Sequence, residues 1–580
     1  MKRSLGLVAV LAVTASLLTA CAPETPHFVS GSSLVIGESA PLSNLNSGVA
    51  ASQASVLASR DLQALTMPAF YSTDSDGKSV ANSNFGTVTS SDATTVQYKL
   101  TGRAKWSDGA VVSTADLLLS WAAATNWGQA GFSSQLAGTS LAKAKTLPRF
   151  DAKSVTLNFE TFTPDYSTAL PVTVAAHLIG QLAFADENLD DQAAAARVET
   201  AISNNWQNDL AKLAVAYNEA LQASAGTNWD KSLIVTAGPY SVVTASATKV
   251  ALKANPDFAF GPAPTVDQLT VNFYADANAL ASDLVAGKVD LARPIASATA
   301  NLNQVAGALK SAADLAVISG FGGEAQYAIF NRADGSEFAT KPDGSNAALV
   351  EAKLAATQLF LPRAGIIDSL SLIDPIERAD SFVLPSTSSD YAASVKGNGS
   401  NDYRFQQAER AAELLTEAGF ARRINVRVLF DSSSANGQLE FGLLARYAKV
   451  AGINLQNVSS DKPAEVLASG AWELYLTDRL SMSQDLSALA LASGSVTSYR
   501  VASTVALAKT LAKAIGESKM TAAQSLALDK DLFDSHFGLP LIQLPNLLAN
   551  SAKLKAFQPN LATQQVTWGY WNWLVSAPAK

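Results

Sequence analysis

Apolar and polar side chains alternate at residues 96–100, a pattern typical of a strand that buries one face. Asp108 and Gly109 then interrupt the pattern and predict a turn, because glycine tolerates positive φ. Ser113 and Asp116 stand at the spacing of a capping box. In this motif the serine side chain accepts from the backbone N–H of the third helical residue, and the side chain of that residue accepts from the backbone N–H of the serine. The pattern therefore predicts a strand, a turn and a capped helix in succession.

The same two periodicities recur along the chain. Alternation predicts further strands at residues 34–36, 155–159 and 269–273, and helical periodicity at 187–225 predicts one or two surface helices. The glycines and prolines of residues 261–264 favour a domain boundary. Strands and helices are thus mixed without a repeat of solenoid period, which predicts the α/β class.

Several conspicuous residues are expected to be structural. Trp106 and Trp121 flank the predicted turn and helix, and we expect both in the core rather than at a ligand. Ser140 and Lys143 have the spacing of a serine nucleophile activated by lysine. The supporting motifs Ser-Asp-Asn and Lys-Thr-Gly are absent, so we interpret this pair as residues of a surface helix and predict no enzyme.

No cofactor or metal site is predicted. Residues 320–325 mimic a dinucleotide-binding loop, but the residues after them, 328–330, have the pattern of a strand instead of the required helix. A glycine loop between two strands, at a cleft, is the better interpretation. His27, His177 and His536 are isolated, because none has a second metal ligand at helical or turn spacing.

The N-terminus has the pattern of an export signal. Lys2 and Arg3 form a basic region, residues 5–18 are apolar, and small residues follow. No later stretch of about 20 apolar residues could span a membrane. Residues 18–21 resemble a bacterial lipobox, whose cysteine becomes the lipidated first residue of the mature protein. Cys21 is the single cysteine of the chain, so no internal disulfide is expected.

Composition predicts a large folded body behind that signal. Of the 580 residues, 48% are hydrophobic and 16% charged, which excludes a disordered chain and favours at least two domains. The net charge is -8 and no basic run is present, so nucleic acid is an improbable partner. Abundant alanine and serine with few lysines suggest a high-GC, actinobacterial source.

The segment around the predicted turn and seven motifs after it resemble the family 5 solute-binding proteins of ABC importers, which include the oligopeptide and dipeptide receptors. In order, the seven are Gly238-Pro239-Tyr240, Asn255-Pro256-Asp257-Phe258, Gly287-Lys288-Val289-Asp290, Tyr327-Ala328-Ile329-Phe330-Asn331, Pro362-Arg363, residues 408–420, and Trp568-Gly569-Tyr570-Trp571-Asn572-Trp573. Each motif is short, and together they cover nearly the whole mature chain. They consist mostly of turns and aromatic residues, so they indicate the fold better than the ligand.

The resemblance implies an α/β, two-lobed periplasmic-binding-protein type II fold of the large peptide-receptor class, with mixed β-sheets and an extra subdomain in lobe one. The expected division is a signal peptide at residues 1–20, a lipidated tether at 21–33, lobe one at 34–264, lobe two at 265–485, and a return to lobe one at 486–580. The chain would cross between the lobes twice and form a hinge.

The function that the resemblance implies is capture of a peptide or other small organic solute in the cleft between the lobes and its delivery to an ABC permease and ATPase. The protein would be a monomer without cofactor, lipid-anchored at the outer face of the cytoplasmic membrane, and extracellular or periplasmic. The alternative is a lipoprotein of the same fold that regulates cell-envelope or glycolipid assembly without import.

Candidate ligand-binding residues follow expected strands. They are Ser43 and Asn46 after the first strand, Phe321 and Gln326 around the glycine loop, and Arg479 and Asp485 after a strand at 474–477.

The last of these loops bears on peptide binding. In peptide receptors of the family, an aspartate three residues before a second aspartate pairs with the peptide's α-amino group. If Asp485 matches the second aspartate, Met482 stands at the amine-binding position and Arg479 replaces an aromatic residue. A buried ammonium without an anionic partner is strongly disfavoured. We therefore expect weak binding of free-amine di- and tripeptides and better binding of blocked, anionic or glycan-bearing solutes.

The lipobox predicts the behaviour of one variant. In Cys21→Ala the cysteine that would carry the lipid is missing, so the protein should appear in the soluble extracytoplasmic fraction or stay unprocessed. Fractionation and the mass of the mature N-terminus measure this outcome. A variant that is still correctly processed and membrane-bound would place the anchor elsewhere.

Overall fold

The computed structural model describes most of the chain and leaves out both ends. It describes residues 28–49, 53–75, 79–90, 94–160, 163, 166–224, 226–294, 299–332, 334–369, 377–420, 422–432, 434–461, 463–477, 480–481, 521–560 and 565–575. The expected signal peptide and Cys21 lie outside these residues. Among the helices described, none combines the length and the apolar character that crossing a membrane requires.

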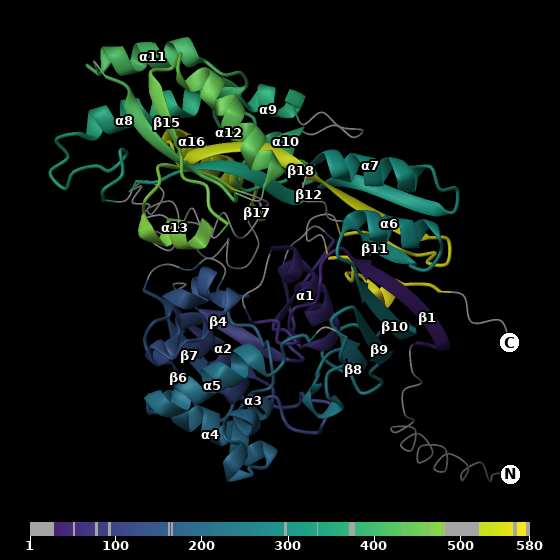
Figure 1. Cartoon of the computed structure of the whole chain (residues 1–580). Helices are drawn as coiled ribbons and strands as arrows, with labels where there is room; N and C mark the ends of the chain where they lie inside the picture. The colour runs from purple at the N-terminus through teal and green to yellow at the C-terminus, as the bar shows by residue number, and fades with distance from the viewer. Residues whose placement is uncertain are drawn as a thin grey trace, which may run out of the picture.

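A mixed sheet of twelve described strands forms the backbone of the molecule outside one subdomain (Figure 1). Its order is β15-β14-β16-β12-β18-β11-β1-β10-β9-β8, with β13 beside β18 and β17 beside β12. The strands are β1 Val29–Glu38, β8 Tyr240–Ser246, β9 Lys249–Ala254, β10 Val266–Phe273, β11 Leu291–Arg293, β12 Leu315–Phe330, β13 Glu377–Arg378, β14 Ile424–Leu429, β15 Ile453–Asn457, β16 Leu474–Leu476, β17 Leu480–Ser481 and β18 Gly538–Ser551.

Helices cover the sheet and build a subdomain beside it, which lies at the lower left of Figure 1. The subdomain contains the small sheet β4 Gly86–Ser90, β5 Thr95–Leu100, β7 Ser154–Asn158 and β6 Arg149–Phe150, with α2 Thr114–Thr125, α3 Ala176–Ala183, α4 Asp191–Ser203 and α5 Gln207–Glu219. The other helices are α1 Gln53–Thr66, α6 Ala277–Val285, α7 Thr299–Lys310, α8 Ala347–Leu359, α9 Arg363–Ser369, α10 Tyr391–Ser394, α11 Ala408–Glu417, α12 Ala435–Ala448, α13 Pro463–Ser469 and α16 Ala522–Asp534. Strands β2 Tyr71–Thr73 and β3 Ser79–Ala81 form a separate pair.

The subdomain confirms the strand, turn and capped helix. Inward-facing residues of β5 are buried in alternation, and Gly109 has φ of +100° in the turn. Ser113 and Asp116 form the capping box at the start of α2. Trp106 and Trp121 are 2% and 0% exposed, which confirms that both belong to the core. The helical period at 187–225 corresponds to α4 and α5, which pack their apolar faces on α2 and α3.

Two long strands, β12 and β18, connect the lobes. They pair antiparallel from Leu315 opposite Ser551 to Ile329 opposite Gly538. The half of the pair near Leu315 packs with α6 and α7, whereas the half near Ile329 belongs to the large core under α8, α11, α12 and α16. The lobe boundaries at 264 and 485 stay predictions. This packing favours crossings inside β12 and β18 instead, so we assign α6, α7 and β11 to lobe one, and lobe two is the part built around the core under α8, α11, α12 and α16.

Two expectations about these strands were wrong. The glycine loop at residues 320–325 is part of β12, because Gly320 and Phe321 pair with β18 and the pairing resumes at Ala325 after a register irregularity. The first strand begins at Val29 rather than at residue 34, so its first residues overlap the expected tether. Residues 30–33 are serines and a glycine and show no alternation, but Val29 and Ser33 already pair with β10.

The surface-helix interpretation of Ser140 and Lys143 was also wrong. The two residues form a short 3-10 helix and are only 9% and 8% exposed. The neighbouring Leu141 is fully buried in the core of the subdomain. This packing explains why apolar residues, Leu141 and Ala142, separate the two polar ones.

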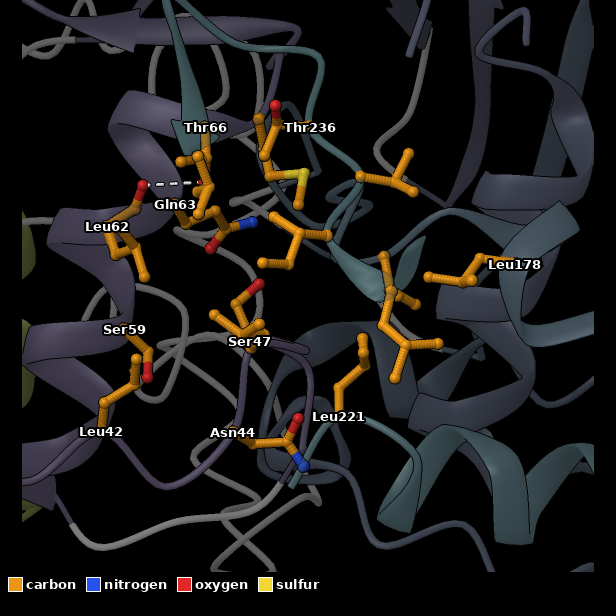
Figure 2. A pocket seen from close by; sticks show the side chains of 17 residues that line it. Leu42, Asn44, Ser47, Ser59, Leu62, Gln63, Thr66, Leu178, Leu221 and Thr236 are labelled. Carbon is orange, nitrogen blue, oxygen red and sulfur yellow. Dashed lines mark hydrogen bonds between the residues drawn. The ribbon is translucent and has the colours of Figure 1, made fainter. Parts of the chain in front are cut away.

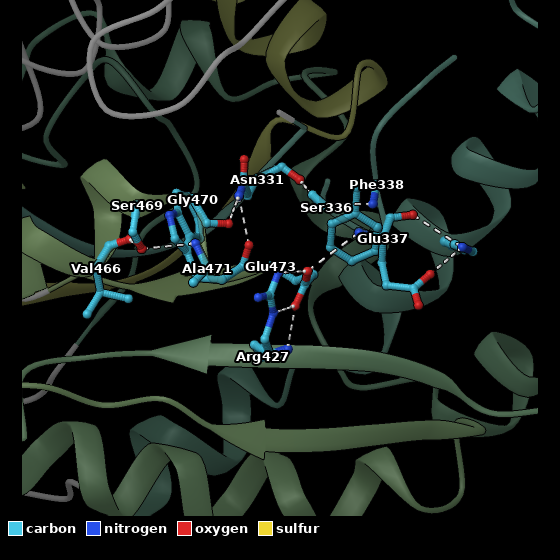
Figure 3. Close-up of polar contacts among 12 residues, drawn as sticks. Asn331, Ser336, Glu337, Phe338, Arg427, Val466, Ser469, Gly470, Ala471 and Glu473 are labelled. Atoms are coloured by element: carbon cyan, nitrogen blue, oxygen red, sulfur yellow. Dashed lines mark hydrogen bonds and ion pairs between the residues drawn. The ribbon is translucent and has the colours of Figure 1, made fainter. Parts of the chain in front are cut away.

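A polar network fixes the strand ends of lobe two (Figure 3). Arg427 of β14 binds Glu473 with both sides of its guanidinium, with Nε–Oε2 and Nη2–Oε1 distances of 2.8 and 2.6 Å. Asn331, the last residue of a family motif, donates from Nδ2 to the carbonyls of Gly470 and Trp472 at 3.2 and 2.8 Å. Asn331 and Glu473 are nearly buried, so the network satisfies groups that would otherwise be costly to bury.

Gly238 supplies a stability test, because the end of α1 leaves no room for a side chain there. A Cβ at Gly238 would lie 2.4 Å from the carbonyl carbon of Thr66 and 2.6 Å from the nitrogen of Met67. Gly238→Ala should therefore lower the free energy of unfolding by about 1–3 kcal/mol, measured by denaturant titration. The control Gly442→Ala, in α12 with open space around it, should raise it by about 0.5–1 kcal/mol. Equal effects of the two substitutions would contradict the close packing.

Candidate ligand-binding cavity

The candidate residues after the first strand have structural partners. Asn46 is 2% exposed; its Nδ2 donates to the carbonyl of Tyr217 at 3.0 Å, and its Oδ1 accepts from the backbone of Gly48. Ser43 is exposed, and its carbonyl accepts from the backbone of Ala223. These contacts hold the segment after β1 on α5 and the chain that follows it. A ligand role for Ser43 and Asn46 stays a prediction.

Two further candidates, Phe321 and Gln326, lie on β12. Gln326 is 4% exposed and donates from Nε2 to Glu440 Oε2 at 2.7 Å. Phe321 pairs with Pro545 in the middle of β12 and β18. Arg479, Met482 and Asp485 lie outside the described residues. The prediction for the amine-binding loop therefore stays a prediction.

A cavity of about 500 Å³ lies within lobe one and is the best described candidate site. It falls in the usual range for sites that bind small organic molecules. Its wall is made by α1 and the residues after it, β2, β3, and three further segments at residues 167–172, 258–262 and 565–571. The cavity thus lies where the subdomain, the large sheet and the C-terminal segment meet. None of the described candidate residues lines it.

The C-terminal aromatic motif forms one wall, and its rings are held in place. Trp568 donates from Nε1 to the carbonyl of Thr73 at 2.8 Å, and Tyr570 donates from its hydroxyl to the carbonyl of Pro262 at 2.9 Å. Trp571 packs edge-on against both, with ring centroids 5.4 and 4.9 Å away. Phe258 and Phe260 add further aromatic surface. The sequence indicated this motif as part of the fold but not as part of a site.

The polar lining consists of hydroxyls, amides and one charge. Among the described lining residues, Arg60 of α1 is the one charged side chain. Besides Tyr71 and Tyr570, the hydroxyl and amide side chains are Gln63, Ser72, Thr73, Asn82, Ser167, Thr168, Gln565 and Thr567. The described lining therefore contains a cation and neutral hydrogen-bonding groups but no carboxylate.

A buried charge cluster supports the wall from behind. Thr567, a lining residue, donates from Oγ1 to Asp61 Oδ1 at 3.3 Å. Arg293 at the end of β11 places Nη2 2.5 Å from Asp61 Oδ2 and 3.3 Å from Oε2 of Glu38, which ends the neighbouring parallel strand β1. Burial raises the pKa of Glu38 from its ordinary 4.5 to about 8; the nearby Asp61 adds to the rise, and Arg293 opposes it. Arg293 and Asp61 are therefore the closer ion pair, and burial favours the protonated form of Glu38.

A small side chamber adjoins the cavity (Figure 2). Its volume is about 30 Å³, which accommodates water but no organic ligand. Gln63 and Met67 line both spaces and separate them, and Gln63 is fixed because its Nε2 donates to the carbonyl of Val172 at 3.0 Å. The space available to a solute is therefore the larger cavity.

Comparison with known proteins agrees with this architecture. Residues 78–497, more than two thirds of the chain, match the family model described as bacterial extracellular solute-binding proteins, family 5, middle region. No curated protein shows a significant match to the sequence.

Three solved structures illustrate the likeness in fold. The periplasmic EDTA-binding protein EppA is 17% identical with a TM-score of 0.64, over 97% of this chain and 100% of that one. AgaA from A. tumefaciens R10, in complex with agropinic acid, is 16% identical with a TM-score of 0.60, over 94% and 99%. DppA from Helicobacter pylori, in complex with the peptide STSA, is 15% identical with a TM-score of 0.59, over 94% and 98%. Identities this low show the fold alone. The structural matches over nearly the whole chain confirm the expected two-lobed type II architecture.

The buried cluster predicts a pH dependence of stability. Between its ordinary pKa and about 8, Glu38 holds a proton in the folded state that the unfolded chain has lost, so the free energy of unfolding falls as pH rises through this range. Glu38→Gln mimics the protonated form. In this variant the free energy of unfolding should decrease with pH by a few kcal/mol less than in the wild type, because one pKa unit is worth about 1.4 kcal/mol. Denaturant titrations between about pH 5 and pH 9 measure the slope. The exposed control Glu377→Gln should keep the wild-type slope, and an unchanged slope in Glu38→Gln would contradict the assignment.

Proposed function

Because the chain belongs to family 5 of the bacterial extracellular solute-binding proteins, we propose that it captures a small organic solute and delivers it to the permease and ATPase of an ABC importer. The observation that supports a binding role most directly is the cavity of about 500 Å³ with its fixed aromatic wall. Preorganised rings and hydrogen-bonding groups lower the cost of ordering the site when a ligand enters.

The lining favours binding over catalysis. The described wall offers aromatic rings, hydroxyls, amides and the guanidinium of Arg60, and it includes no His, Lys, Cys or carboxylate that could act as general base or nucleophile. Ser140 and Lys143, the pair with nucleophile spacing, are nearly buried and line no part of this cavity. We propose that the protein is not an enzyme.

The same lining suggests the class of solute. A guanidinium in a partly enclosed aromatic site favours an anionic group, and aromatic rings favour a planar or sugar ring packed against them. A free ammonium would need a carboxylate, which the described wall does not offer. The solute that fits best is an anionic organic molecule with a ring, and free-amine peptides fit less well. EppA and AgaA of the same fold bind EDTA and agropinic acid, both of them acids, whereas DppA binds a peptide.

The place of action follows from the N-terminus. Lipidation of Cys21 would hold the monomeric receptor at the outer face of the cytoplasmic membrane, close to its permease. The segment between the cysteine and β1 would be the tether, now shortened because β1 begins at Val29. The alternative, a same-fold lipoprotein that regulates envelope assembly, predicts solute binding without uptake.

Arg60 tests the class of solute. Mass spectrometry of gently purified protein identifies a retained solute, and calorimetry then compares it with blocked peptides, ring-bearing acids and free-amine peptides. For the anionic ligand, Arg60→Gln should weaken binding about tenfold or more, because a hydrogen bond to a charged group contributes about 1.5–3 kcal/mol. The control Arg410→Gln, on the exposed face of α11, should leave the affinity unchanged.

Two results would overturn parts of the proposal. Submicromolar binding of free-amine peptides that N-acetylation abolishes would contradict an anion-binding site and indicate an amine pocket. Deletion of the gene should abolish uptake of the identified solute. Normal uptake together with altered envelope composition would instead support the regulatory alternative.

A further inference from the structure

One histidine that the sequence left isolated has two carboxylates beside it in the fold. His177 of α3 places Nε2 2.8 Å from Oδ2 of Asp108, which lies in the turn before α2. Asp191, the first residue of α4, completes the group, and one ligand atom from each of the three side chains lies within 4.8 Å of the others. Spacing could not reveal this group, because the three residues come from three separate segments of the subdomain.

Each member of the group is oriented by a neighbour. Asp108 Oδ1 accepts from the backbone of Ala110 at 3.1 Å, and this contact directs Oδ2 toward His177. Gln181, one turn after His177, donates from Nε2 to Asp191 Oδ1 at 2.9 Å. The His177 ring packs edge-on against Trp106 with centroids 6.2 Å apart. Such outer partners fix the orientation of ligands in metal sites.

We propose that Asp108, His177 and Asp191 bind a divalent metal ion of the Zn²⁺ class. One imidazole nitrogen and two carboxylate oxygens are ligands that Zn²⁺ and neighbouring divalent metals accept. Two tetrahedral ligands about 2.1 Å from one ion are about 3.4 Å apart. His177 Nε2 and Asp108 Oδ2 are 2.8 Å apart, so they need to separate by only about 0.6 Å to admit the ion.

The remaining geometry is also compatible with an ion. The third ligand has to approach by roughly 1–2 Å, and Asp191 is only half-buried at the start of its helix, so a side-chain rotation suffices. The Asp108 side chain is 33% exposed while that of His177 is 4% exposed. Water can therefore fill the open coordination positions from the Asp108 side. An ion there would join the turn before α2 to α3 and α4.

Calorimetric titration of Zn²⁺ into metal-stripped protein tests the proposal. We expect one site per chain with micromolar or tighter affinity and a thermal midpoint that rises with Zn²⁺ concentration, because an ion that binds only the folded state stabilises it. Asp191→Asn should weaken binding at least tenfold. The asparagine oxygen can still accept from Gln181, so the metal-free stability should stay unchanged. His177→Asn should abolish binding.

His536→Asn is the matched control, because His536 is the other described histidine and contacts Gln358 and Glu351 in lobe two. It should bind Zn²⁺ as the wild type does. Absence of both heat and thermal shift in the wild type would overturn the proposal and leave a simple hydrogen bond between Asp108 and His177. Binding that survives Asp191→Asn and His177→Asn but is lost in His536→Asn would overturn it as well.

Discussion

The antiparallel pairing of β12 with β18 is the constraint on which the rest of the architecture depends. These strands extend from the core of lobe two to the core of lobe one, so the same ladder of backbone hydrogen bonds belongs to both lobes. Only after β18 has returned can residues 565–571 reach lobe one and close the cavity. The irregularity between Phe321 and Ala325 interrupts the ladder in its middle, where a bulge locally disrupts pairing and bends a strand.

Lobe one also depends on an unusual balance of buried charge. A buried ion pair contributes little net stability, but removing one partner is strongly destabilising because an uncompensated charge stays behind. Arg293 faces two carboxylates, and burial raises the pKa of Glu38 and so limits the negative charge that gathers around this one guanidinium. Asp61 follows Arg60 directly in α1, and its side chain accepts a hydrogen bond from Thr567 on the cavity wall. The cluster therefore aligns the strand ends, the helix that presents Arg60 and the C-terminal segment.

Sequence periodicity predicted local structure well and three-dimensional neighbours poorly. The capping box of Ser113 and Asp116 was predictable because its partners are three residues apart. The run at 320–325 was misread because glycines in a bulged strand and in a loop have the same composition. Trp568 and Trp571 were noted as a fold motif, but their place in a cavity depends on segments hundreds of residues away. For the same reason, His177 showed no partner in the sequence.

The position of the cavity limits how a ligand can drive closure. Ligand shifts an open–closed equilibrium only by the difference in its affinity for the two states. Every described lining segment of the cavity belongs to lobe one or its subdomain, and their aromatic groups are held in place by contacts within that lobe. A solute that fills the cavity and touches nothing else would bind both states equally and close nothing, however tightly it bound. An imported solute must therefore extend beyond Arg60 and the aromatic wall to groups on lobe two. Contacts with those groups on lobe two would distinguish a solute that closes the protein and is transported from a solute that only occupies the cavity.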